Sequence, residues 1–200
     1  MNLKKWFFLF WTTIVVGIVG QCVVQIIWFA QGDSNLSSIN LGSIIAIITV
    51  GSTFSVFSQM GFFAYLTLNY IGRGFFKTQL SWQIVQWFLI VVVFVDLIII
   101  PQLVFQPESL PYIRYAFFPI ILFIISMIAA VIKSRLTKWT AFTPALFFLF
   151  VGTSLEVVPA LRLDDFNQLI YMAVPILFCN VYQILILHKL LNNESNAVSS

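Results

Sequence analysis

The stretch WTAFTPALFFLFVGTSL, residues 139–155, contains no charged side chain, and the acidic Glu156 follows it directly. A helix rises ~1.5 Å per residue, so about 20 apolar residues cross the ~30 Å hydrocarbon core of a bilayer. We therefore expect a membrane-spanning helix at residues 139–160. Glu156 then lies near one end of that helix, with Arg162 just beyond it, after Pro159.

The composition of the whole chain also indicates that a lipid bilayer surrounds the protein. Of its 200 residues, 60% are hydrophobic and only 8% are charged, whereas about 25% of the residues of an average soluble domain are charged. Mean hydropathy is +1.00. Such a chain cannot cover a water-facing surface, so we predict an integral membrane protein. The net charge of +3 is small, and nothing in its distribution suggests a nucleic-acid partner.

Apolar segments of spanning length recur along the chain. We predict an all-α fold, a bundle of six transmembrane helices in a single domain at residues 1–191, with a disordered tail at 192–200. The first segment is too long for the apolar region of a signal peptide, so we expect a retained anchor. The second is the most polar, and its Ser52, Ser55 and Gln59 predict a helix-packing stripe. The predicted helices cover, approximately, residues 6–30, 39–68, 82–104, 112–132, 139–160 and 168–188.

Basic side chains orient this bundle. Eight of them fall on one side of the segments and two on the other, so the positive-inside rule places both termini in the cytoplasm. The linker at 69–81 is then a flexible, basic cytoplasmic turn, and Trp82 after it is an interfacial anchor that keeps its indole N–H in water. The cytoplasmic set is Lys4, Lys5, Arg73, Lys77, Lys133, Arg135, Lys138 and Lys189, and the outer pair is Arg114 and Arg162.

Asp96 and Glu156 are the only acids within the apolar segments. Counted along their helices, both reach about the same depth near the outer edge, where Arg114 and Arg162 also lie. An unpaired charge at membrane depth costs at least ~2.5 kcal/mol, so we expect a polar network of these four residues, in which Arg114 is the easier partner for Glu156. Two other interpretations stay open: a proton or ligand site, and hydration of acids at the interface.

The chain contains four distinctive segments: SQMGFFAYLTLNYIGRGFF (58–76), FVDLIII (94–100), TAFTPALFFLFVGTSLEVVPALR (140–162) and CNVYQILILHKL (179–190). They resemble the KbaA family, the KinB-signalling pathway activation proteins of spore-forming Gram-positive bacteria, and the similarity extends over most of the chain. The resemblance implies an accessory protein of the bacterial cell membrane, required for one sensor histidine kinase to feed the phosphorelay that starts sporulation. It implies no chemistry for individual residues.

From these features we expect a protein that acts by helix contact with the membrane domain of the kinase. The sequence has no set of nucleophile and base, no phosphate-binding glycine loop and no cluster of metal ligands, since Cys22, Cys179 and His188 are isolated. We therefore expect no enzyme activity, no cofactor and no metal. The alternative is a small proton-coupled transporter or permease that uses Asp96 and Glu156. No internal repeat of three helices supports that alternative.

Overall fold

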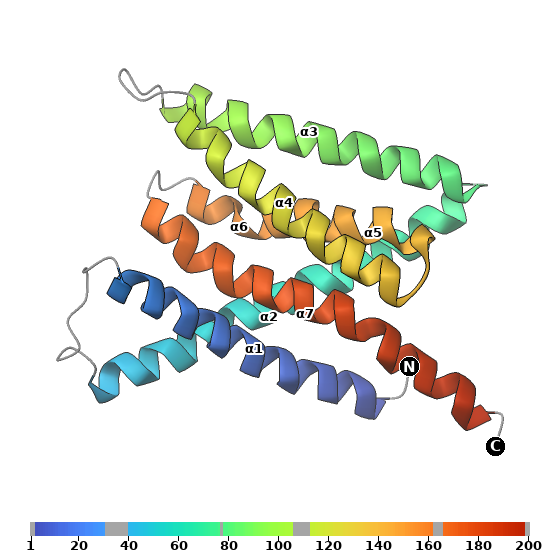
Figure 1. The fold of residues 1–200 in the computed structure, drawn as a ribbon, viewed down its shortest axis with the longest axis horizontal. Helices are drawn as coiled ribbons and strands as arrows, with labels where there is room; N and C mark the ends of the chain where they lie inside the picture. Colours follow the sequence, from blue (N-terminus) through green and yellow to red (C-terminus); the bar gives the residue numbers. More distant parts are fainter. Residues whose placement is uncertain (1–2, 31–39, 77, 106–112, 162–165, 199–200) are drawn as a thin grey trace. The chain divides into compact units, whose positions relative to one another are not determined.

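The computed structural model describes residues 3–30, 40–76, 78–105, 113–161 and 166–198, and every regular element in these ranges is a helix (Figure 1). Six segments within them are long and apolar enough to cross a membrane. The predicted all-α fold with six candidate spans is confirmed. Insertion into a membrane and the position of both termini in the cytoplasm stay predictions.

Most of the spans are single helices, and one is composite. The single helices are α1 (Leu3–Ala30), α2 (Leu41–Phe75), α3 (Gln79–Phe105), α4 (Ile113–Leu136) and α7 (Phe166–Val198). The composite span consists of the 3-10 turn η2 (Trp139–Ala141), α5 (Phe142–Phe147), the π-helical turn η3 (Phe148–Gly152) and α6 (Thr153–Leu161). A π-helical turn holds one extra residue, so it rotates everything after it by about 100° relative to an uninterrupted α-helix.

The chain forms two compact units, unit 1 (residues 1–60 and 166–200) and unit 2 (residues 61–165), whose boundary falls within α2. In unit 1, α1 packs along α7 (Figure 1). A Cβ added to Gly17 of α1 would lie 2.5 Å from the Gly51 carbonyl of α2, and one added to Gly20 would lie 2.8 Å from the Cα of Pro175 in α7. Glycines thus let α1 approach both of its neighbours closely, as small residues do between membrane helices.

In unit 2, α3 and α4 pack against the composite span around a cluster of aromatic rings. Phe123 of α4 and Phe94 of α3 both contact Phe150 of η3, with ring centroids 5.4 and 5.9 Å from it. Phe148, also in η3, contacts Phe62 of α2 at 5.5 Å. The π-helical turn therefore presents two buried rings to three different helices.

The linker expected at residues 69–81 is largely helical, because α2 and α3 extend into it from both sides. The two helices are joined by Trp82, which is only 5% exposed. Its indole N–H donates a hydrogen bond to Asn69 Oδ1 at 3.0 Å, and its ring lies over Gly72, where an added Cβ would be 2.6 Å away. The predictions of a flexible turn and of a water-facing indole were wrong, since Asn69 takes the place of water and Gly72 leaves room for the ring.

Helix α7 also extends beyond its predicted bounds. It continues past residue 188, the expected end of the sixth span, to Val198. Residues 189–198 contain no proline and no glycine, so no helix breaker ends it earlier. The structure therefore has helix at residues 192–198, within the predicted disordered tail.

Candidate functional site

A buried polar contact joins α2 and α7 in unit 1. The hydroxyl of Ser58 donates a hydrogen bond to Asn180 Oδ1 at 2.8 Å, and the Gln183 amide donates through Nε2 to Ser58 Oγ at 3.0 Å. All three side chains are fully buried. Because a buried polar group needs a hydrogen-bond partner, these two bonds couple α2 to α7, and a shift of one helix along the other would break both.

Helix α1 takes part in the same polar region through its backbone. The Gln59 amide of α2 donates through Nε2 to the Phe10 carbonyl at 3.4 Å, and the Cys179 thiol of α7 donates to the Thr13 carbonyl at 3.6 Å. Three helices of unit 1 thus share one set of buried polar groups. We call this set the polar core; its residues are Thr13, Ser55, Ser58, Gln59, Asn180 and Gln183.

The packing stripe predicted on α2 lies partly in the polar core. Ser55 and Gln59 are buried, and Ser52 is half-buried. Ser52 donates to the Ile48 carbonyl and Ser55 to the Ser52 carbonyl, both at 2.7 Å, so these two hydroxyls are satisfied within α2, whereas Gln59 reaches α1.

Sequence reasoning missed the contribution of α7 to this core. Asn180 and Gln183 stand three residues apart in an otherwise apolar segment. Residues at that spacing lie on the same face of a helix. Two amides on one face of an apolar helix are the signal that would have indicated a polar contact with another helix.

Glu156 lies half-buried in α6, directly against Gly61 of α2. A Cβ added to Gly61 would overlap the carboxylate, with Cδ of Glu156 only 2.8 Å away. The missing side chain of Gly61 therefore leaves the space that the carboxylate fills. The π-helical turn before α6 sets the direction of Glu156, because an uninterrupted α-helix would turn this side chain away by about 100°.

The other members of the predicted polar network are described only in part. Asp96 is exposed on α3. Arg114 belongs to the first turn of α4, but its side chain lies outside the described residues, as does the whole of Arg162. The network of Asp96, Arg114, Glu156 and Arg162 stays a prediction.

Comparison with known proteins assigns the chain to a family. Residues 10–190, which include the polar core and the contact of Gly61 with Glu156, match KbaA, described as KinB-signalling pathway activation in sporulation. The chain belongs to the KbaA family. It is 34% identical over 179 residues to the KinB-signaling pathway activation protein of Bacillus subtilis (strain 168), an alignment that covers 86% of this chain and 90% of the relative. No solved structure matches the chain.

Membership of the KbaA family confirms the resemblance seen in the sequence. It connects this chain to KinB signalling in sporulation, and the family description is that of a signalling activator. The family name gives no role to individual residues. The polar core and the contact of Gly61 with Glu156 are two places in this KbaA protein where polar side chains contact a neighbouring helix.

Proposed function

We propose that this protein is a multi-pass protein of the bacterial cell membrane that activates a sensor histidine kinase pathway leading to sporulation. Membership of the KbaA family carries the proposal, because the match extends over residues 10–190 and the related protein is aligned over 90% of its length. The six candidate spans support a location in the membrane. The distribution of basic residues supports an arrangement with both termini in the cytoplasm.

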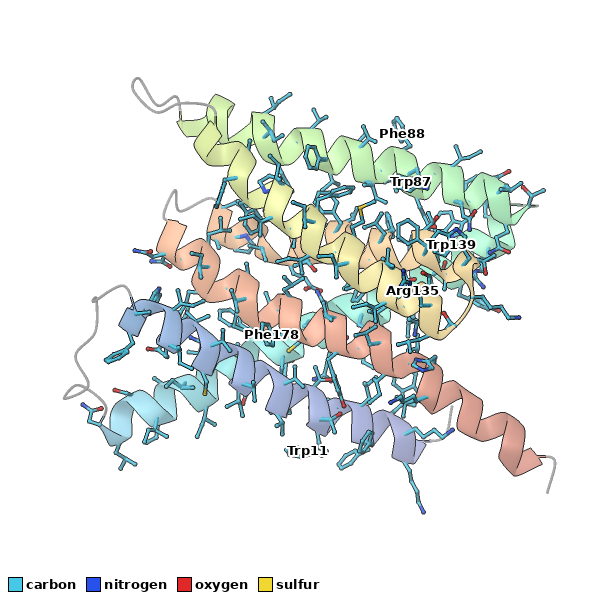
Figure 2. The ribbon with its side chains drawn as sticks, in the orientation of Figure 1. Trp11, Trp87, Phe88, Arg135, Trp139 and Phe178 are labelled. Atoms are coloured by element: carbon cyan, nitrogen blue, oxygen red, sulfur yellow. The ribbon has the colours of Figure 1, made fainter. Side chains whose placement is uncertain are left out.

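We propose that activation works through contacts between helices of this protein and the membrane domain of the kinase. The faces of α1 and α3 carry large exposed apolar side chains: Trp11, Trp87 and Phe88 are 54%, 39% and 65% exposed (Figure 2). Such faces suit both lipid and a second membrane helix. A helix contact that binds one state of the kinase more tightly than the other shifts the kinase toward that state.

The polar core supports this mechanism by fixing unit 1. Its hydrogen bonds connect α1, α2 and α7 to one another, and they hold the helices in a single register. Interhelical hydrogen bonds in membrane proteins contribute ~0.6 kcal/mol on average and up to ~1.7 kcal/mol each. A bundle with a fixed register presents a constant surface to a partner helix.

A proton-coupled permease is the competing function, because Glu156 places a carboxylate within a candidate span. Ionisable residues within spans often belong to ion or proton pathways. Such a carrier needs a carboxylate that gains and loses a proton in every cycle. A helix contact needs the shape of the side chain and not its titration.

The first experiment removes the protein from a sporulating strain that also contains the cognate kinase. Sporulation through that kinase should fall, and a constitutively active form of the kinase should restore it. Crosslinking in membranes followed by purification tests direct contact, and the kinase should co-purify with the protein. Failure of the active kinase to restore sporulation would contradict the pathway assignment, and absence of the kinase after crosslinking would contradict the contact mechanism.

The second experiment uses the neutral variants Asp96→Asn and Glu156→Gln. Each keeps the size of its side chain, so both should support sporulation whenever the protein accumulates to normal levels. Loss of sporulation in both variants at normal protein levels, together with a flux driven by a pH gradient in proteoliposomes, would establish the permease instead.

A further inference from the structure

Unit 2 contains a buried lysine at the end of α4, a helix that contacts η2. Lys133 lies in the last turn of α4 and is only 6% exposed, and among the residues that the structure describes its Nζ has no hydrogen-bond partner. Nearby Arg135 and Lys138 are exposed, as is usual for basic residues at the end of a span, and Figure 2 shows Arg135 at this end of α4. A buried ammonium group without a counter-charge is strongly destabilising. An anion beside Lys133 would remove this cost.

A second buried polar group lies on α3. Gln86 is fully buried, and within the described part of the chain neither its Nε2 nor its Oε1 has a hydrogen-bond partner. Helices α3 and α4 pack as antiparallel neighbours, and the contact of Phe94 with Phe123 at 5.8 Å sets their register (Figure 1). Gln86 lies eight residues before Phe94, and Lys133 lies ten residues after Phe123. These separations are ~12 and ~15 Å toward the same end, so Gln86 and Lys133 lie within about one helical turn of the same level.

Helix α5 adds a third polar residue at this level. It runs beside α3 in the same direction (Figure 1), and the Gln83 amide donates to the Thr140 carbonyl at the start of the composite span at 3.5 Å. Thr143 follows Thr140 by three residues, as Gln86 follows Gln83. Thr143 is also buried, with 8% of its surface exposed. An ammonium, an amide and a hydroxyl from three helices therefore share one depth inside unit 2.

We propose that Gln86, Lys133 and Thr143 form a binding site for a small anion, a phosphate or carboxylate group held between α3, α4 and α5. The ammonium, the amide and the hydroxyl offer more hydrogen-bond donors than acceptors. Phosphate and carboxylate oxygens accept such bonds, and their charge compensates that of Lys133. The same group can be supplied by a free anion or by the headgroup of an anionic phospholipid.

Binding of the anion stabilises the packed arrangement of these three helices. A ligand that binds the folded protein and not the unfolded chain raises the free energy of unfolding in proportion to the logarithm of its concentration. The stability of unit 2 then depends on the supply of the anion. This response requires neither the kinase nor a membrane potential, so it is measurable on the purified protein.

The experiment measures thermal unfolding of the full chain in phosphatidylcholine nanodiscs. Sodium phosphate or acetate is compared with sodium chloride at the same ionic strength, and saturating phosphate should raise Tm by about 5 °C. Nanodiscs that contain phosphatidylglycerol separate the two sources: a raised Tm without added phosphate supports the lipid headgroup, and a rise only with added phosphate supports the free anion. If Tm is unchanged by phosphate, acetate and phosphatidylglycerol alike, the proposal is overturned.

The variant Lys133→Met removes the charge and keeps the apolar stem. It should lose the response to the anion, and in chloride alone it should unfold at a higher temperature than the parent protein because the uncompensated charge is gone. Arg135→Met is the matched control, since it removes an exposed charge from the same turn of α4 and should keep the full response. Equal loss in the two variants would indicate attraction to the surface and would overturn the site.

A second variant keeps the test decisive if Lys133→Met does not accumulate. Gln86→Leu leaves Lys133 in place and removes the amide, so it should weaken phosphate binding by about tenfold. A response identical to that of the parent protein would remove Gln86 from the site and overturn the proposal.

Discussion

Gly61 and Glu156 fit together so closely that a Cβ atom on the glycine would occupy the space of the carboxylate. The two residues come from different helices, α2 and α6, and the π-helical turn before α6 directs the carboxylate toward the glycine. A side chain at position 61 must therefore displace Glu156 or separate the two helices. The contact depends on the absence of a side chain in one helix and on an irregular turn in the other.

The variant Gly61→Ala should be less stable than Gly74→Ala by roughly 1–3 kcal/mol, the usual cost of forcing extra volume into a packed site. The amount of folded protein after extraction from membranes, measured by size-exclusion chromatography of a fluorescent fusion, reports this loss. Gly74→Ala is the matched control, because it lies in the same helix and an added Cβ there, outside that helix's own backbone, meets no atom of the described residues within 4 Å. The control should be neutral or stabilised by up to about 1 kcal/mol, and equal loss in both variants would contradict the proposed fit.

The polar core makes a second prediction, about Ser58 and Asn180. Ser58→Ala and Asn180→Leu each remove one partner of the same hydrogen bond, so the double variant should cost less than the sum of the two single ones. We expect a coupling energy between ~0.6 and ~1.7 kcal/mol from a double-mutant cycle. Ser52→Ala should change stability little, because that hydroxyl bonds to a carbonyl of its own helix. Strictly additive effects of Ser58→Ala and Asn180→Leu would show that the two residues do not stabilise each other.

The spans and the polar face of α2 could be predicted from the sequence because each corresponds to a regular pattern of residues along one segment. Long apolar runs indicate spans, and Ser55 and Gln59 share a face through their spacing of four residues. The π-helical turn left no such pattern, since residues 144–152 around it carry no polar side chain, and one extra residue among them shifts no polar face. The sequence also did not reveal the partners of Ser58 and Trp82. These partners are the amides of Asn180 and Asn69, and the sequence around an amide does not show which group it binds.

The third prediction concerns the side of the membrane on which each terminus and loop lies. Fusions placed after residues 75, 136 and 195 should be active only with reporters that work in the cytoplasm, and fusions near 35, 108 and 165 only with reporters that work outside. The excess of basic residues on one side of the spans is the reason for this expectation. External activity after residue 195 would mean an odd number of spans, in contradiction to the six-helix arrangement.

The last prediction concerns the pairing of Glu156 with Arg114. If the two residues are partners, Glu156→Gln leaves the arginine uncompensated near the outer edge of the membrane, at a cost of about 2.5 kcal/mol, and the amount of folded protein should fall. Arg114→Gln, added to Glu156→Gln, removes that uncompensated charge and should restore part of the loss. Arg135→Gln is the control, because it removes an exposed arginine from the opposite end of the same helix and should restore nothing. If Glu156→Gln and Arg114→Gln are each harmless and their effects add, the carboxylate is hydrated at the interface and does not belong to an ion pair, since only coupled charges make the second substitution compensate for the first.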